Sequence, residues 1–302
     1  MFQSTFTVLS LIQQTTIMII FGATIVDTML KRKKHANFLN NLVELDSILA
    51  EFPSNEICKD ELTSLHRQHI FVICFNGLNR ICDSVVNVNL MDEHEHFYNA
   101  MQFFQTASLS LDAYYIRCLA TILNHRCLPI FESLNAIGDD LKMSNSSREH
   151  TSKLISCFKT FDNVMHLKKQ LSNIFGVQLL LITAFDFIIS TISVYGSMYY
   201  HNLLTLYFNI AYNIPQTVKC VLLATSLDTL GNQMDLIFLK INHMEKSKYV
   251  TASNFYPVNR AMLYGMAAAI VTHMLIIFQF QMWEDSQPNI KPQNVTSIHG
   301  QP

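Results

Sequence analysis

Several ionisable side chains lie inside long apolar segments of this 302-residue chain. An isolated charge is costly to place in hydrocarbon, so such groups either pair with one another or face a polar cavity that binds a ligand or conducts ions. Arg80 and Asp83 stand three residues apart, close enough to pair on one helix face. We expect structural pairing for most of these groups, with ligand contact as the alternative. The ionisable residues concerned are Arg80, Asp83, Asp112, Arg117, Asp186 and Lys219.

Other residue patterns that could indicate catalysis or metal binding give only weak signals. The motifs G-x-S-x-G, H-E-x-x-H, G-x-G-x-x-G and the P-loop pattern do not occur in the sequence, which disfavours the common hydrolase, protease and nucleotide-binding sites. The segment from Glu93 to His96 combines two carboxylates with two imidazoles, but its spacing does not predict a transition-metal site, and we interpret it as a solvated external turn. We expect no enzymatic activity, no metal and no cofactor.

Composition points to a membrane protein. Half of the residues are hydrophobic, only 15% are charged, and the mean hydropathy is +0.21, which is unusual for a soluble domain. A net charge of -2 excludes the basic surface expected of a nucleic-acid-binding protein. The seven cysteines form no C-x-x-C pair and are odd in number, so we expect free thiols. The lipid bilayer is therefore the expected partner.

An apolar helix needs about 20 residues to cross a bilayer. Segments of this length occur near residues 6–29, 69–90, 100–123, 174–200, 203–227 and 261–283. The second and third are polar enough that hydropathy alone allows a soluble core instead. Because lipid offers no hydrogen bonds to the backbone, each span is predicted to be helical. The predicted fold is all-α, a polytopic membrane protein with about six transmembrane helices in one domain, residues 1–302.

The distribution of Lys and Arg predicts the orientation. Basic residues concentrate in the segments 30–68, 124–173 and 228–260, whereas the connections 91–99 and 201–202 carry none. Positive residues favour the cytoplasmic side, so the basic segments are predicted to be cytoplasmic and both chain ends external. The glycosylation sequon at Asn294 then faces outward and is a candidate glycan acceptor.

The cytoplasmic segment 124–173 has helical periodicity. We expect two helices with a Ser/Asn-rich turn between them near 143–149, or alternatively an ordinary linker. The apolar positions with this spacing are Leu128, Phe131, Leu134, Ile137 and Leu141, then Leu154, Ile155, Phe158, Phe161, Val164, Met165, Leu167 and Leu171.

The last apolar segment carries a recognisable pattern. Thr272 and His273 are followed by five hydrophobic residues and then by Gln279 and Phe280. The pattern resembles the signature of insect gustatory receptors, in which a tyrosine usually stands where this chain has His273. The lead-in 255–260, the segment 38–46 and the segment 174–180 also resemble that family.

The resemblance implies a seven-helix ligand-gated cation channel with an internal N-terminus. Since only six spans are found here, we expect that the chain lacks the family's first helix. The resemblance makes the helices of 124–173 extensions of the neighbouring spans, which form an intracellular anchor between subunits. It also implies assembly around the final helix, as a homotetramer or a heterotetramer with other gustatory receptors.

Two sites follow from the resemblance. The family's gate and polar pore ring match Ile276 and Gln279, and His273 lies on the same stripe, where an imidazole could make gating sensitive to pH. For Ile276 the alternative is a lipid-facing side chain, and for Gln279 a helix cap near the interface. The family's ligand pocket lies in the outer half of the bundle, and the polar and aromatic residues expected there are Gln13, Asp83, Asn87, Gln102, Gln105, Tyr195 and Tyr212.

The sequence thus predicts a gustatory receptor in the plasma membrane of a sensory neuron dendrite, responding to a small-molecule tastant such as a sugar or a bitter compound. The alternatives are an odorant receptor of the same superfamily, a non-functional truncated receptor, and a transporter-like protein. A transporter is disfavoured because no internal inverted repeat is found.

Overall fold

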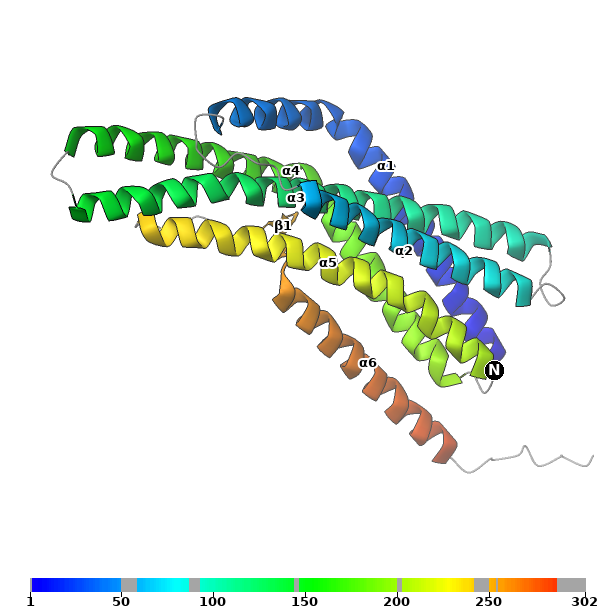
Figure 1. Ribbon diagram of the computed structural model, residues 1–302. Coiled ribbons are helices and arrows are strands. Elements are labelled where there is room, and N and C mark those ends of the chain that lie inside the picture. Colours follow the sequence, from blue (N-terminus) through cyan, green and yellow to red (C-terminus); the bar gives the residue numbers. More distant parts are fainter. Residues whose placement is uncertain are drawn as a thin grey trace, which may run out of the picture.

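The computed structural model describes residues 2–49, 59–86, 93–143, 147–199, 203–241, 250–253 and 255–286, and in this part of the chain it is almost entirely helical. Six helices and one short hairpin follow one another along the chain (Figure 1). The predicted all-α class is confirmed. The elements are α1 (Phe2–Leu49), α2 (Lys59–Val86), α3 (Glu93–Met143), α4 (Ser147–Tyr199), α5 (Leu203–Ile241), β1 (Thr251–Ala252), β2 (Tyr256–Pro257) and α6 (Arg260–Ser286).

Four of the helices are much longer than a membrane span. Helices α1, α3, α4 and α5 have 48, 51, 53 and 39 residues, whereas about 20 residues cross a bilayer. The periodic segment 124–173 is helical on both sides of 144–146 and continues α3 and α4 without a break, so the linker alternative is wrong. The interpretation of residues 93–96 as a turn is also wrong, because α3 begins at Glu93.

The ends of the helices separate into two groups in Figure 1. The N-terminus lies beside the C-terminal end of α4 and the N-terminal end of α5, and the C-terminal end of α6 points to the same side. The C-terminal end of α3 and the N-terminal end of α4 lie at the opposite end of the bundle. This arrangement agrees with the sides predicted from the distribution of Lys and Arg.

The predicted cytoplasmic half contains a packed core. Helix α1 contributes Phe38, Leu42 and Leu45 at helical spacing, and all three are buried. They belong to the same core as buried residues of the extended parts of α3, α4 and α5, among them Ile130, Leu134, Val164, Leu167, Leu171, Leu230 and Met234. Ile155 belongs to the same periodic pattern but is 61% exposed.

The hairpin β1–β2 sits against α4 at a glycine. A Cβ atom on Gly176 would lie 2.7 Å from the backbone nitrogen of Ser253 and 3.1 Å from its Cα. Ser253 has a φ of 49° at the tip of the hairpin, and the backbone nitrogen of Thr251 donates to Ser172 Oγ at 3.2 Å. The hairpin backbone therefore reaches α4 only because position 176 has no side chain.

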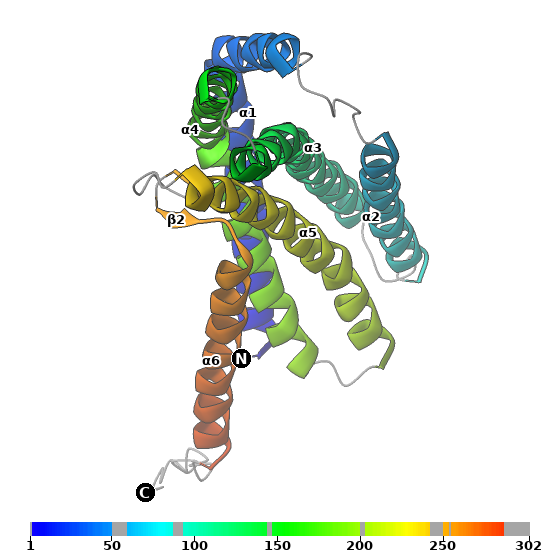
Figure 2. The ribbon, with the colours of Figure 1, turned by 60° about the vertical axis from the view of Figure 1, so that its left-hand side comes forward.

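The hairpin leads directly into α6. The backbone nitrogen of Met262 donates to Asn259 Oδ1 at 3.0 Å, so Asn259 caps the first turn of α6. From there α6 diverges from the other helices, as Figures 1 and 2 show. Most of its described side chains are exposed.

Among the described residues, two helical stretches are long and apolar enough to cross a membrane by length and composition. They are 150–194 in α4 and 260–279 in α6, each with a best-window mean hydropathy of 2.0. The window in α4 is 44% buried inside the bundle, whereas the window in α6 has no buried residue. Other helices of the chain thus cover part of the apolar window of α4, whereas they bury no residue of the window in α6.

Replacing Gly176 with alanine should weaken the docking of the hairpin. In an unstrained helix, glycine to alanine adds up to about 1 kcal/mol of stability. At position 176 the added methyl group meets backbone atoms, which cannot yield as a flexible side chain does. We expect Gly176→Ala to lower the melting temperature of the purified protein. Gly138→Ala in α3, where no atom lies within 4 Å of the added methyl group, should be neutral or stabilising. Equal melting temperatures for the two variants would contradict the docking role of Gly176.

Candidate functional site

Helix α6 presents an apolar surface that its own chain leaves uncovered. His273, Ile276 and Gln279 follow one another at spacings of three residues and share one side of the helix. All three are exposed, and Ile276 retains 44% of its accessible surface. The other exposed large apolar side chains of α6 include Tyr264, Val271, Leu275, Phe278 and Met282. An apolar helix exposed in this way requires lipid or another chain around it.

The polar groups of α6 are partly satisfied within the helix. The hydroxyl of Thr272 donates to the carbonyl oxygen of Ala268 at 2.8 Å, and Nδ1 of His273 donates to that of Ala269 at 2.7 Å. The ring of His273 also meets Phe187 of α4 edge-on, with ring centroids 6.4 Å apart. The side chain of Phe280 lies outside the described residues.

Of the seven residues expected to line the outer pocket, only Gln105 has a described side chain. The side chain of Gln105 in α3 is buried, and its amide nitrogen lies 2.6 Å from the sulfur of Met18 in α1. Asn87 and Asn294 lie outside the described residues. The remaining five positions lie in five different helices, but their side chains are not among those described: Gln13, Asp83, Gln102, Tyr195 and Tyr212.

Buried polar groups beside Gln105 extend this polar region. Asn76 of α2 donates to the hydroxyl of Thr106 at 3.3 Å, and both residues are buried. Asn79 donates to the carbonyl oxygen of Ala211 in α5 at 3.0 Å. The sequence analysis did not select these residues as site residues. Their signal was the i, i+3 spacing of two asparagines in a predicted span, which places both on one face.

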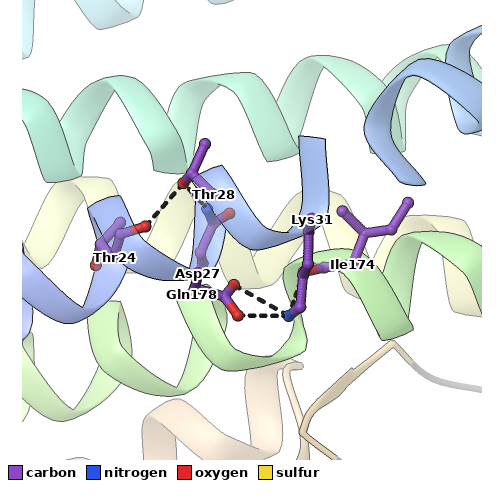
Figure 3. A network of polar contacts seen from close by, with 6 residues as sticks. All are labelled: Thr24, Asp27, Thr28, Lys31, Ile174 and Gln178. Atoms are coloured by element: carbon purple, nitrogen blue, oxygen red, sulfur yellow. Dashed lines mark hydrogen bonds and ion pairs between the residues drawn. The ribbon is translucent and has the colours of Figure 1, made fainter. Parts of the chain in front are cut away.

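A second polar network joins α1 to α4 (Figure 3). Lys31 forms an ion pair with Asp27 at 2.8 Å and donates to the carbonyl oxygen of Ile174 at 2.9 Å. One turn away, the amide of Gln178 donates to the hydroxyl of Thr28 at 2.7 Å. Lys31 follows the predicted span 6–29, and Ile174 begins the predicted span 174–200. The network therefore ties α1 to α4 at the predicted cytoplasmic ends of these two spans.

The third polar contact is an ion pair in the middle of the bundle. Asp186 of α4 and Lys219 of α5 are both buried, with Nζ and Oδ1 2.7 Å apart. Lys219 also donates to Gln216 at 2.9 Å and lies 5.5 Å from the centroid of the Phe185 ring. Structural pairing is confirmed for these two residues. The side chains of Arg80 and Asp83 are not among those described, so their pairing stays a prediction.

Removing one partner of this ion pair should destabilise the protein more than replacing both partners with apolar residues. Asp186→Leu leaves the ammonium group of Lys219 buried without a counter-charge, which typically costs about 3–5 kcal/mol. The double variant Asp186→Leu/Lys219→Met removes both charges and should recover most of the lost stability. We expect the single variant to show a lower melting temperature and lower surface expression than the double variant. Additive losses from the two substitutions would show that each residue acts through other partners.

Comparison with known proteins agrees with this geometry. The family model described as 7tm Chemosensory receptor matches residues 1–247 and 216–284. No curated protein matches the chain. The solved structure of the insect olfactory receptor OR5 from Machilis hrabei is similar to the fold, with a TM-score of 0.61 and 15% sequence identity, over 90% of this chain and 81% of that one.

A second structure of OR5 from Machilis hrabei, in complex with eugenol, matches with a TM-score of 0.49 and 13% identity, over 89% of this chain and 78% of that one. The similarity to the first OR5 structure supports the helical fold. The family model covers nearly all of the described residues and shows the family to which the chain belongs. The chain belongs to the 7tm chemosensory receptor family and is a polytopic helical membrane protein.

Proposed function

We propose that this protein is a gustatory receptor of the plasma membrane: a ligand-gated, non-selective cation channel that responds to small-molecule tastants such as sugars or bitter compounds. The observation that carries the proposal is α6, a helix long enough to span the bilayer whose apolar surface the rest of the chain leaves exposed. A membrane helix that carries a polar stripe and keeps most of its surface exposed within its own chain is suited to line a pore between subunits.

In this proposal four copies of α6 surround the pore, from one kind of chain or together with other gustatory receptors. Ile276 then forms an apolar ring, and Gln279 forms a ring of amides one turn farther out. Apolar constrictions close by dewetting, and amide oxygens replace part of the hydration shell of a cation. The exposure of both residues supports these roles.

The ligand would bind in the outer half of the bundle, near Gln105. Buried amides and hydroxyls from α2 and α3 lie there, and an amide oxygen of Asn76 has no hydrogen-bond partner among the described residues. Such groups suit a ligand rich in hydroxyl groups. A ligand that binds the open arrangement more tightly than the closed one shifts the population toward the open channel.

The gustatory assignment rests on the pattern from Thr272 to Phe280, and an odorant receptor is the second candidate. Expression with a calcium indicator, alone and with other gustatory receptors, tests the proposal with sugars, bitter compounds, amino acids and volatile odorants. A response to a soluble tastant supports the gustatory assignment. A response to volatile odorants alone would favour the odorant alternative, and silence to every class at normal surface expression would contradict a channel.

Two substitutions in α6 test the pore. Ile276→Ser should raise basal current because it hydrates the closed gate, and Gln279→Arg should abolish cation flux because four added charges repel cations. Phe278→Ser is the matched control, since Phe278 is also exposed but, two residues after Ile276, lies on the opposite face of α6. Currents measured by patch clamp would exclude this face from the pore if all three variants behaved like the parent.

His273 should make gating depend on pH. An imidazole changes charge between about pH 5 and 8, and this ring lies on the proposed pore stripe, against the aromatic Phe187. Protonation would add positive charge beside the gate and lower cation current at acidic pH. We expect His273→Tyr to remove this dependence while the channel stays functional. A pH profile of ligand-evoked current that is the same in both proteins would show that His273 plays no part.

A further inference from the structure

A polar cavity of about 230 Å³ lies between α2, α3 and α5, apart from the outer pocket and from α6. Hydroxyl and amide side chains dominate its lining, together with one guanidinium group and one carboxylate. The lining residues are Glu61, Ser64, Leu65, Gln68, Arg117, Thr121, Asn124, Leu222, Thr225, Ser226 and Thr229.

Arg117 is the charged group at the centre of the argument. It retains only 6% of its accessible surface. Its recorded hydrogen bonds reach neutral groups: Nη2 donates to Gln68 Oε1 at 3.0 Å, and Nε donates to Ser226 Oγ at 3.4 Å. A buried guanidinium normally lies against a carboxylate or a phosphate, because burial without a counter-charge is costly. No carboxylate among the described residues forms an ion pair with Arg117.

The other lining groups fit an anion that also carries hydroxyl groups. Thr121, Thr225 and Ser64 supply hydroxyls. Asn124 has a buried amide oxygen without a hydrogen-bond partner among the described residues, so it can accept a bond from a ligand hydroxyl. The one carboxylate, Glu61, is already paired with His125 at 2.5 Å, and its side chain is 46% exposed.

All three helices reach the cavity where their predicted spans end on the cytoplasmic side. The residues from α2 precede the span that begins at 69, those from α3 surround its end at 123, and those from α5 surround its end at 227. The cavity therefore lies at the level of the lipid headgroups of the inner leaflet. That leaflet holds the anionic phospholipids, and basic pockets between helices at this depth bind phosphorylated headgroups.

We propose that this cavity binds the phosphate-bearing headgroup of an anionic lipid of the cytoplasmic leaflet. Arg117 holds the phosphate with charge-assisted hydrogen bonds, and the hydroxyl and amide groups around it bind the polyol to which the phosphate is attached. Because the bound headgroup contacts α2, α3 and α5 at once, it fixes the position of these helices relative to one another. The inference rests on the predicted membrane orientation, and its test reads binding, so it does not depend on channel activity.

The test uses the full chain in nanodiscs of phosphatidylcholine, with and without phosphatidylinositol 4,5-bisphosphate. A ligand that binds only the folded state raises the melting temperature, and titration of the lipid yields an apparent affinity. We expect the lipid to raise the melting temperature of the parent protein. Arg117→Gln should weaken the apparent affinity at least about tenfold, the loss expected for charge-assisted bonds, and Arg117→Lys should retain part of it.

Lys33→Gln is the matched control, because Lys33 is an exposed residue of α1 that carries the same charge outside the cavity. It should leave the affinity unchanged. If Arg117→Gln does not fold, the double variant Thr121→Val/Thr225→Val removes two hydroxyls at nearly constant volume and should also weaken binding. A parent protein without any lipid-dependent shift would overturn the proposal, as would equal losses of affinity in Arg117→Gln and Lys33→Gln.

Soluble inositol 1,4,5-trisphosphate in phosphatidylcholine nanodiscs distinguishes the source of the phosphate. If it raises the melting temperature at lower concentration than the lipid, and Arg117→Gln abolishes this effect, the ligand is a free phosphate ester, and the lipid proposal is wrong. If only the lipid acts, or acts at lower concentration, the headgroup proposal stands.

Discussion

The contact between Gly176 and Ser253 determines how the last helix leaves the bundle. The backbone of the hairpin touches the backbone of α4, so the start of α6 has a defined position on the helix that also contacts α1, α3 and α5. The cap by Asn259 then begins α6 within a few residues of this contact. A helix that leaves its own bundle needs a fixed starting position. Backbone packing at Gly176 provides it without long side chains that could change rotamer.

The rest of the bundle depends on polar contacts between helices. Lys31, Gln178, Asp186 and Lys219 each find a partner on another helix. In a membrane these contacts are needed because a polar group that faces lipid is costly. They also explain why α2 and α3 fall short of the hydropathy of a membrane span, since several of their polar side chains are satisfied inside the bundle.

The two halves of the molecule differ in how they are packed. The predicted cytoplasmic half is a tight core that joins Phe38, Leu45 and Leu49 of α1 to the extensions of α3 and α4. The membrane half keeps buried polar groups near Gln105 and Arg117 and leaves α6 uncovered. The proposed ligand site and the proposed pore between subunits use these two kinds of surface, which the chain itself does not fill.

Periodicity and length were sufficient to predict the helices. Local geometry depends on residues that are neighbours in the sequence. It is specified by the apolar run in α6, by the alternation of segments with and without Lys and Arg, and by the spacing of Phe161, Val164 and Leu167. The family followed from the pattern Thr272 to Phe280 for the same reason, since it is a contiguous motif. The length of α3, by contrast, was underestimated, because Glu93 to His96 have no apolar signal and were interpreted as a turn.

Contacts between distant residues were decided only by the tertiary structure. The sequence shows that Asp186, Lys219 and Arg117 lie in apolar segments, but their partners depend on how helices rotate against one another. That rotation brought Asp186 to Lys219 and left Arg117 with neutral groups beside a cavity. The need for glycine at 176 was equally invisible, because it arises from a hairpin more than 70 residues away. A one-dimensional pattern specifies which face of a helix is apolar, whereas packing in three dimensions specifies what that face meets.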